Sequence, residues 1–353
     1  MKDVMAQQAA MTAAMTAAMT AAMTAAMTRR RWCLSAGAGA AAWMAAGAGW
    51  AQEAAYPSKP IRLIVPFPAG GGGDTMARLV MGRVATELGQ SIVVENLGGA
   101  GGNVGSAQAA KAAPDGYTLL YGTNGTHGIN QTLYKRPGFS ATQDFEPVGR
   151  LTRIAAMLVA RPGLEATNAR ELIARLKAAP GRYTYASAGN GTTSHLAAEI
   201  LKSAAGVAVV HIPYRGGAAA MTDLIGGQVD WMFEVMPNAA PQARAGRVRP
   251  LAVSTARRVA GFDDVPTLAE SGVPGFDLSA WDAIFAPAGT PPAVVERLNA
   301  AIQKVLADPE LRKQLAARGA EPWAATPAET RAFVAAEVQR WGDAVKRSGA
   351  AVD

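Results

Sequence analysis

The stretch IRLIVPFPAGGGGDTM, residues 61–76, decides how the rest of the chain is interpreted. Its first five residues are mostly branched and apolar, which predicts a buried strand over 61–65. Pro66 and Pro68 end the strand, four glycines follow, and the apolar spacing from Met76 onward predicts an amphipathic helix. A strand, a glycine loop and a helix start leave backbone N–H groups without partners, and glycines let a ligand approach those groups closely. The stretch therefore predicts an anion site.

Residues 1–55 differ from the rest of the chain and are expected to be removed. The unit Met-Thr-Ala-Ala repeats over 11–27, a low-complexity run with nothing to bury. From Met27, three arginines, an Ala/Gly-rich apolar stretch and small residues up to Ala51 follow the order of a secretory signal peptide. Arginines before Trp32 also suit the twin-arginine route, so export by the Sec route and by the twin-arginine route both stay open. Met1 and Met27 are both possible start codons. The alternative is a membrane anchor, for which an apolar stretch of about 17 residues is marginal.

Removal of the leader changes both the charge and the cysteine content. Residues 1–51 hold four of the 34 basic and one of the 27 acidic residues, which leaves 34 − 4 = 30 basic and 27 − 1 = 26 acidic, a net charge of +4. This mild charge favours the approach of an anionic solute and does not indicate a nucleic-acid surface. The only cysteine, Cys33, lies in the leader, so the mature chain has neither a disulfide nor a thiol nucleophile. We expect an exported soluble protein.

After residue 75, strand and helix patterns alternate. Strands are expected at 91–95, 117–121, 145–160, 183–187, 207–213, 227–233, 251–254 and around 281–286, and helices at 75–88, 169–178, 196–204, 219–225, 293–307 and 327–347. This alternation predicts an α/β fold with a mainly parallel sheet covered on both faces. Ligands of such sheets gather beyond the carboxyl ends of the strands, where the glycine loops and Thr123 lie.

The arrangement of strand, glycine loop and helix occurs a second time. The strand at 183–187 enters the loop Ala188-Gly189-Asn190-Gly191, and hydroxyl-bearing residues open the next helix. Two units with similar loops suggest two lobes that face each other across a cleft.

Several enzyme and nucleotide motifs are missing. A Walker loop needs Gly-Lys-Ser/Thr after the glycines, where this chain has Gly73-Asp74-Thr75. The glycines at 99–105 loosely match a dinucleotide fingerprint, but the spacing is wrong and the following strand lacks the acidic residue that holds a ribose. There is no Gly-x-Ser-x-Gly elbow, and Ser194 and His195 are adjacent on a helix, where side chains diverge.

Other candidate residues allow a binding role and an ordinary structural one. His127, His195 and His211 lack metal-ligand spacing; the first two lie in loops expected to line the cleft. Asp74 can contact a ligand or cap the helix that it opens. Asp230 can face the cleft or fix a neighbouring loop, and Tyr214 with Arg215 can close over an anion or lie in a solvated loop.

Six motifs in order resemble one known family. They are VPFPAGGGGDTMARLV, TNGTHGINQTLY, ASAGNGTTSHLAAE, YRGGAAAMTDLIGGQVDWMF, DVPTLAESGVPGF and APAGTPPAVVERLN. Together they are similar to the Bug-type periplasmic solute receptors of tripartite tricarboxylate transporters, over essentially all of residues 56–353. The resemblance implies a two-lobed periplasmic-binding-protein fold of type II-like form, with two crossover strands as the hinge. The implied lobes are 56–156 plus 285–353, and 157–284.

The resemblance also implies a ligand and a site. Ligands of the family are small organic acids, held largely by backbone N–H groups and water. The residues expected to bind the carboxylate are Phe67, Ala69, Gly70, Gly71, Gly72, Gly73, Asp74, Thr123, Ser187, Asn190, Gly191, Thr192, His195, Tyr214 and Asp230. Gly73 stands where relatives often carry Ser or Thr, so a side-chain hydroxyl is missing and a different preferred acid is expected. Ala219 replaces a proline common after the Tyr-Arg-Gly turn, which is expected to loosen that loop.

These expectations define a binding protein with no catalytic residue, metal or cofactor. It is expected to be a monomer that captures an organic acid and delivers it to membrane transporter subunits or a sensor kinase, without binding nucleic acid. A periplasmic enzyme acting on a carboxylate is the alternative, and a dinucleotide oxidoreductase is a third class.

Overall fold

The computed structural model describes residues 7–24, 56–350 and 352. Residues 7–24 form an exposed helix in a unit, Met1–Ala55, that is separate from the compact unit Tyr56–Asp353. The predicted signal peptide over 27–51 lies outside the described residues. Within the described ranges, no helix combines the length and the apolar character needed to cross a membrane.

The compact unit contains one sheet of ten strands. Its main path has the order β2-β1-β3-β9-β4-β7-β5-β6, and β8 and β10 pair with β4 beside this path. The strands are β1 Ile61–Val65, β2 Ile92–Asn96, β3 Thr118–Thr123, β4 Phe145–Ala160, β5 Thr184–Ser187, β6 Val210–Pro213, β7 Trp231–Val235, β8 Arg249–Val253, β9 Ser279–Pro287 and β10 Ala320–Pro322.

The prediction of a mainly parallel sheet was wrong. The pairs β1–β2, β1–β3, β5–β6 and β5–β7 are parallel, whereas β3–β9, β4–β9, β4–β7, β4–β8 and β4–β10 are antiparallel. The parallel strands lie toward the two ends of the sheet, where short helical crossovers connect them. The middle of the sheet is antiparallel because β4 and β9 carry the chain in opposite directions between the two ends.

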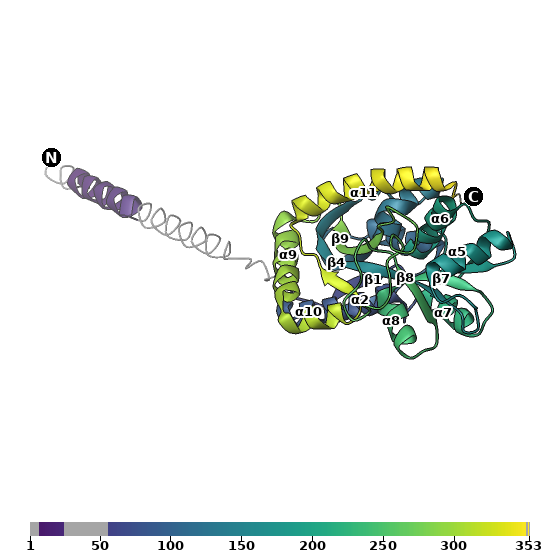
Figure 1. Ribbon diagram of the computed structural model, residues 1–353. Coiled ribbons are helices and arrows are strands. Elements are labelled where there is room, and N and C mark those ends of the chain that lie inside the picture. Colours follow the sequence, from purple (N-terminus) through teal and green to yellow (C-terminus); the bar gives the residue numbers. More distant parts are fainter. Residues whose placement is uncertain (1–6, 25–55, 351, 353) are drawn as a thin grey trace. The chain divides into compact units, whose positions relative to one another are not determined.

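Helices cover this sheet, as Figure 1 shows, and α11 runs along one side of the unit from α9 toward α6. The helices are α2 Gly72–Leu88, α3 Asn103–Ala110, α4 Asn130–Leu133, α5 Ala169–Ala178, α6 Thr193–Ala205, α7 Gly217–Ile225, α8 Met236–Arg244, α9 Pro292–Ala307, α10 Pro309–Ala316 and α11 Pro327–Ser348. Two short helical turns, η1 Ala100–Gly102 and η2 Gly125–Ile129, follow β2 and β3.

Strand β4 connects two halves of the sheet. Residues 145–155 pair with β9, and residues 156–160 pair with β7. We call β2, β1, β3, β9, β10 and residues 145–155 the first half-sheet, and residues 156–160 with β5, β6, β7 and β8 the second half-sheet. The chain returns to the first half-sheet at β9, which pairs with both β3 and β4. The lobe boundaries implied by the family resemblance stay a prediction.

Alternating side chains of β4 contribute to two different cores. Ala156, Leu158 and Ala160 pack with α5 and α6, whereas Met157 and Val159 pack with α7 and α8 on the opposite face. This period of two is that of a strand buried on both faces, which explains the continuous apolar run in its sequence. Burial of a leucine side chain such as that of Leu158 contributes roughly 1.5–3 kcal/mol to the free energy of folding, relative to leaving it exposed.

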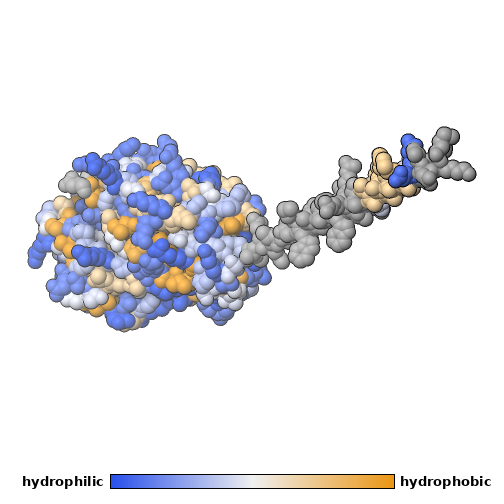
Figure 2. All heavy atoms as spheres, turned by 180° about the vertical axis from the view of Figure 1, so that it is seen from behind, coloured by the Kyte–Doolittle hydropathy of each residue, from blue (hydrophilic) through white to orange (hydrophobic). Residues whose placement is uncertain are grey.

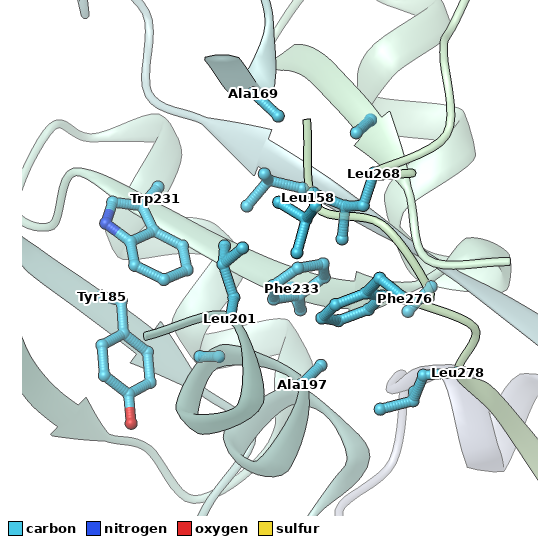
Figure 3. Packing of buried hydrophobic residues seen from close by; sticks show 14 of the residues in the cluster. Leu158, Ala169, Tyr185, Ala197, Leu201, Trp231, Phe233, Leu268, Phe276 and Leu278 are labelled. Carbon is cyan, nitrogen blue, oxygen red and sulfur yellow. The ribbon is translucent and has the colours of Figure 1, made fainter. Parts of the chain in front are cut away.

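Aromatic rings fill much of the core between β7 and α6. Figure 3 shows the rings of Phe233 and Phe276 side by side, with centroids 6.0 Å apart, and Trp231 beside Tyr185, with centroids 5.1 Å apart. The face shown in Figure 2 has its hydrophobic residues in small groups between hydrophilic ones. The apolar residues of the second half-sheet are therefore used mainly inside the protein, where they hold β7 and α6 in place.

Candidate functional site

A cavity of about 290 Å³ lies where three helix starts meet. The loop before α2, the start of α6 and the start of α7 each contribute residues. The carboxyl ends of β3 and β7, the start of β9 and Ile154 in the middle of β4 complete the walls. The lining residues are Phe67, Pro68, Ala69, Gly71, Gly72, Gly73, Tyr121, Thr123, Asn124, Ile154, Ala188, Thr192, Thr193, Ser194, Arg215, Gly216, Gly217, Ala218, Ala219, Glu234, Val235, Ala280 and Trp281. Both half-sheets therefore contribute to one cavity.

None of these three helices has a side-chain cap. Their N-cap residues are Gly71, Thr192 and Gly216, and no side chain accepts a hydrogen bond from the first turn at any of them. By contrast, side chains cap α5, α10 and α11. The first N–H groups of a helix lack intrahelical partners and carry a partial positive charge. The cavity is therefore surrounded by backbone donors suited to an anion.

Arg215 adds a full positive charge to these partial ones. It is the single Lys or Arg in the lining, it is exposed, and within the described residues it forms no ion pair. A guanidinium without a carboxylate partner is available to an anionic ligand. The cavity has apolar walls as well, made by Phe67, Ile154 and Trp281 among others.

Asp74 holds the first glycine loop in place. Its Oδ2 accepts a hydrogen bond from the Gly70 N–H at 3.0 Å, and its Oδ1 accepts from Arg78 Nε and Asn96 Nδ2, both at 2.9 Å. Burial alone would raise the pKa of Asp74, but the hydrogen bonds from Gly70, Asn96 and Arg78, together with the Arg78 charge, lower it. Asp74 therefore stays ionised and shapes the loop, and neither it nor Gly70 lies in the cavity lining.

The second glycine loop is held by side chains beneath it. Ser187 Oγ lies 2.7 Å from His211 Nε2 and accepts a hydrogen bond from the Gly189 N–H at 3.2 Å. His195 Nδ1 accepts from the Gly191 N–H at 3.3 Å, and the rings of His195 and His211 stack with centroids 4.5 Å apart. Burial lowers the pKa of both histidines to about 4, so they are neutral at pH 7.

The group of Ser187, His195 and His211 lies outside the cavity lining, which includes Thr192, Thr193 and Ser194. Ser187 is fully buried, and neither it nor His195 or His211 is among the residues that line the cavity. His127 is also buried and lies outside the lining. Its ring stacks on that of Phe285, with centroids 3.9 Å apart. Within the described residues, no group of three His, Cys, Asp or Glu side chains is arranged to hold a metal ion.

The two half-sheets touch around the cavity. Thr193 Oγ1 donates a hydrogen bond to Asn124 Oδ1 at 3.0 Å, and the Tyr134 hydroxyl donates to the Asn190 carbonyl at 3.1 Å. A methyl group on Gly191 would overlap Asn130 Oδ1, and one on Gly72 would overlap Val235. The glycine loops therefore allow close approach of one half to the other.

The structure brings together about half of the predicted site residues. Those in the cavity lining are Phe67, Ala69, Gly71, Gly72, Gly73, Thr123 and Thr192. Those outside the lining but in the loops or helix starts that form it are Gly70, Asp74, Asn190, Gly191 and His195, with Ser187 beneath.

Tyr214 and Asp230 lie apart from the lining. The Tyr214 hydroxyl donates to Asp223 Oδ2 at 2.7 Å, so its hydrogen is already used. Asp230 pairs with Arg161 at 3.0 Å and accepts from the Thr184 N–H at 2.8 Å, which fixes the start of β7. We leave both out of the ligand contacts proposed below.

Other lining residues were not anticipated from the sequence, chiefly Tyr121, Glu234 and Trp281. The hydroxyl of Tyr121 donates to Asp282, and burial raises the pKa of Asp282 to about 6. Glu234 stands near the carboxyl end of β7, so the rule that ligands gather at strand ends pointed to it. The expected strand ended at residue 233, one residue too early.

Comparison with known proteins shows which family has this fold and cavity. The family model described as "Tripartite tricarboxylate transporter family receptor" matches residues 76–350. The structure of the periplasmic binding protein BugD is 38% identical with a TM-score of 0.81, and the match covers 84% of this chain and 99% of that one.

Two similar structures contain ligands. Rpa4515 of R. palustris with adipate is 35% identical, with a TM-score of 0.82 over 83% of this chain and 98% of that one. MatC from Rhodopseudomonas palustris with bound malate is 35% identical, with a TM-score of 0.78 over 82% of this chain and all of that one.

Two halves joined by crossover strands, with a cavity between them, define a two-lobed periplasmic solute-binding protein. The predicted fold class is thereby confirmed. The chain belongs to the tripartite tricarboxylate transporter receptor family, which includes the Bug receptors, as its motifs indicated. Members of this family are binding receptors rather than enzymes.

Proposed function

We propose that this receptor captures a small organic carboxylate in the cavity between its half-sheets. The observation that carries the proposal is the convergence of three uncapped helix starts and Arg215 on one cavity. Each helix start offers N–H donors and positive partial charge, which favour a carboxylate over a neutral or cationic group. Gly71 to Gly73, Thr192 and Arg215 are the residues that we expect to contact it.

The walls suggest the rest of the ligand. Phe67, Ile154, Val235 and Trp281 present apolar surface between the helix starts. A compact acid with a carbon chain or ring suits such walls, because its charged end reaches the donors while its body is removed from water. The adipate of Rpa4515 and the malate of MatC are acids of suitable size, and they support this choice of ligand class.

Delivery follows capture in this proposal. The loaded receptor presents its acid to a tripartite tricarboxylate-type membrane transporter or, alternatively, to a sensor kinase. The match to the transporter receptor family supports the first partner. Export by the Sec or twin-arginine route and action as a monomer in the periplasm remain part of the proposal.

A thermal-shift panel tests the ligand class. The panel contains adipate, malate, citrate, aspartate, nicotinate and benzoate, with ATP as the nucleotide comparison. A ligand at 100 times its dissociation constant adds about 2.7 kcal/mol to the free energy of unfolding, which raises the melting temperature by several degrees. We expect at least one acid to do so. A rise with ATP and with none of the acids would contradict the proposal.

A further inference from the structure

Glu234 is a buried carboxyl group in a cavity otherwise suited to anions. It lines the cavity, its exposed fraction is 2%, and its Oε2 has no hydrogen-bond partner. The carboxyl lies against the start of α7, where a methyl group on Gly217 would come within 2.6 Å of both carboxyl oxygens. A buried polar atom without a partner is costly, so its retention in a ligand cavity indicates a group that is satisfied by the ligand.

Burial of Glu234 disfavours its charged form and acts against the partial positive charge at the start of α7. Met157 of β4 pairs with Glu234 across the sheet, and Gly217 of α7 lies against its carboxyl group. The polar group that α8 contributes is the Asn238 amide. Burial raises the pKa of Glu234 to about 7, although Asn238 and the Val235 N–H favour the charged form. At neutral pH about half of the molecules therefore hold a proton on this side chain.

Charged and titratable groups near β7 do not neutralise Glu234. Tyr121 and Arg215 share the cavity with it. The other groups have partners of their own. Among the acidic groups, Asp74 of α2 binds Arg78, Glu199 of α6 binds Lys202 and Tyr185, and Asp223 of α7 accepts a hydrogen bond from Tyr214. Among the basic groups, His195 of α6 stacks on His211, and Arg244 of α8 donates to the Ala317 carbonyl. Burial is therefore the main influence on this carboxyl group.

We propose that Glu234 binds the ligand in its protonated form and donates its carboxyl hydrogen to a carboxylate oxygen of the acid. Where Glu234 is ionised in the free protein it takes up a proton from solvent on binding, and its O–H bond is the only covalent bond that forms. This inference rests on the proposed function, because it requires a carboxylate ligand. It makes Glu234 a specificity-determining residue and makes capture of the acid stronger at lower pH.

A ligand ammonium group paired with ionised Glu234 is the competing arrangement. Three helix starts and Arg215 surround the same cavity with positive charge, which disfavours a cation there. An ionised Glu234 beside a bound carboxylate would repel it, and burial of the Glu234 side chain weakens the screening of this repulsion by water. Protonation avoids this repulsion and, at pH 7, lowers the apparent affinity only about twofold.

Calorimetric titration of the wild-type protein with adipate and with malate tests the proton. The titrations run from pH 6.5 to 8.5, where the carboxylates of both probes are ionised, in buffers of different ionisation enthalpy. With a pKa of about 7 we expect uptake of about half a proton at pH 7 and about 0.9 at pH 8. Affinity should fall about 25-fold from pH 6.5 to pH 8.5.

Three variants separate this role from a structural one. Glu234→Gln keeps a hydrogen donor without titrating, so its affinity should vary less than about twofold over this pH range, with no proton uptake. Glu234→Ala should bind about tenfold more weakly than wild type at pH 6.5. Glu165→Gln, at an exposed carboxyl distant in sequence, should keep the pH dependence of wild type.

The outcomes distinguish the two proposals. Binding without proton uptake, or an unchanged pH dependence in Glu234→Gln, overturns the role of Glu234 and leaves the receptor function intact. Proton release on binding of an amine-bearing acid, with weaker binding in Glu234→Gln, supports the ammonium arrangement and also overturns it. Absence of binding by every acid at every pH overturns both proposals.

Discussion

Gly71 offers a direct test of backbone approach at the scale of one residue. It lines the cavity as the N-cap of α2, its φ is −77° and its ψ is 170°, and a methyl group there would meet only the Pro68 carbonyl at 3.6 Å. A β-branched residue can adopt this extended backbone. We expect Gly71→Val to fold normally and to bind its acid roughly tenfold or more weakly, because the side chain occupies space that the ligand needs. Calorimetry and a melting curve measure both effects.

Gly82 provides the matched control for Gly71. It is an exposed glycine of the same helix, with nothing within 4 Å of an added methyl group. Gly82→Ala should leave affinity unchanged and stabilise α2 by about 1 kcal/mol. Equal affinity of Gly71→Val and Gly82→Ala would place the ligand away from the first glycine loop.

Single residues also show where prediction from sequence fails. Asp74 and Asp230 each allowed a ligand contact or a structural role, and the local pattern did not separate the two. The decision depends on partners distant in the chain, such as Asn96 for Asp74 and Arg161 for Asp230. Glu234 was missed because the expected strand ended at residue 233, and its burial against α7 and α8 is a property of the fold.

At the scale of elements, helix N-termini differ in whether a side chain caps them. The N-termini of α5, α10 and α11 are capped by Asn168, Asp308 and Thr326. Those of α2, α6 and α7 are not capped by any side chain. A missing cap leaves donors unpaired, which is costly for a helix unless a ligand or water pairs with them. Helices α3, α4, α8 and α9 also lack a side-chain cap, so the site is distinguished by the convergence of three uncapped starts on one cavity.

Many elements could be predicted from local patterns, and some boundaries could not. The residue range of β4 was predicted correctly from its apolar run. Helix α2 ends at Leu88, as expected, and Gly89 follows it in the left-handed conformation. The start of α2 at Gly72, rather than Thr75, was missed because glycine has low helix propensity. Helix α8 was missed because Pro237 and Pro241 mask its pattern.

Contact between the glycine loops of the two half-sheets yields another prediction. The φ of Gly191 is +79°, and a methyl group there would overlap Asn130 Oδ1 across the gap between the half-sheets. We expect Gly191→Ala to lower affinity for the acid roughly tenfold, because the second loop can no longer reach its place beside η2 and α4. Calorimetry gives the affinity, and a melting curve gives the cost of the strained backbone.

Gly181 separates backbone strain from steric contact. Its φ is +75°, close to that of Gly191, but nothing lies within 4 Å of an added methyl group. Gly181→Ala should lose about 1 kcal/mol of stability and keep wild-type affinity. If the two alanine variants bind equally well, close approach at Gly191 is not needed for binding.

At the scale of the whole molecule, the sheet order explains why the site lies between two halves. Strands β4 and β9 run antiparallel through the middle, and the parallel strands on either side direct their carboxyl ends and following helices toward one cavity. Alternation of strands and helices predicted the parallel ends but not the antiparallel middle, because crossover strands look like any other buried strand in a sequence. The six ordered motifs supplied what local patterns could not.

The central claim is that the cavity binds a carboxylate through helix N-termini and Arg215. Calorimetric titration with the strongest dicarboxylate of the panel and with its diamide, which has nearly the same shape without the charge, tests this claim most directly. Loss of charge-assisted hydrogen bonds should weaken the diamide roughly ten- to a hundredfold relative to the acid. A diamide that binds as tightly as its acid would contradict the account.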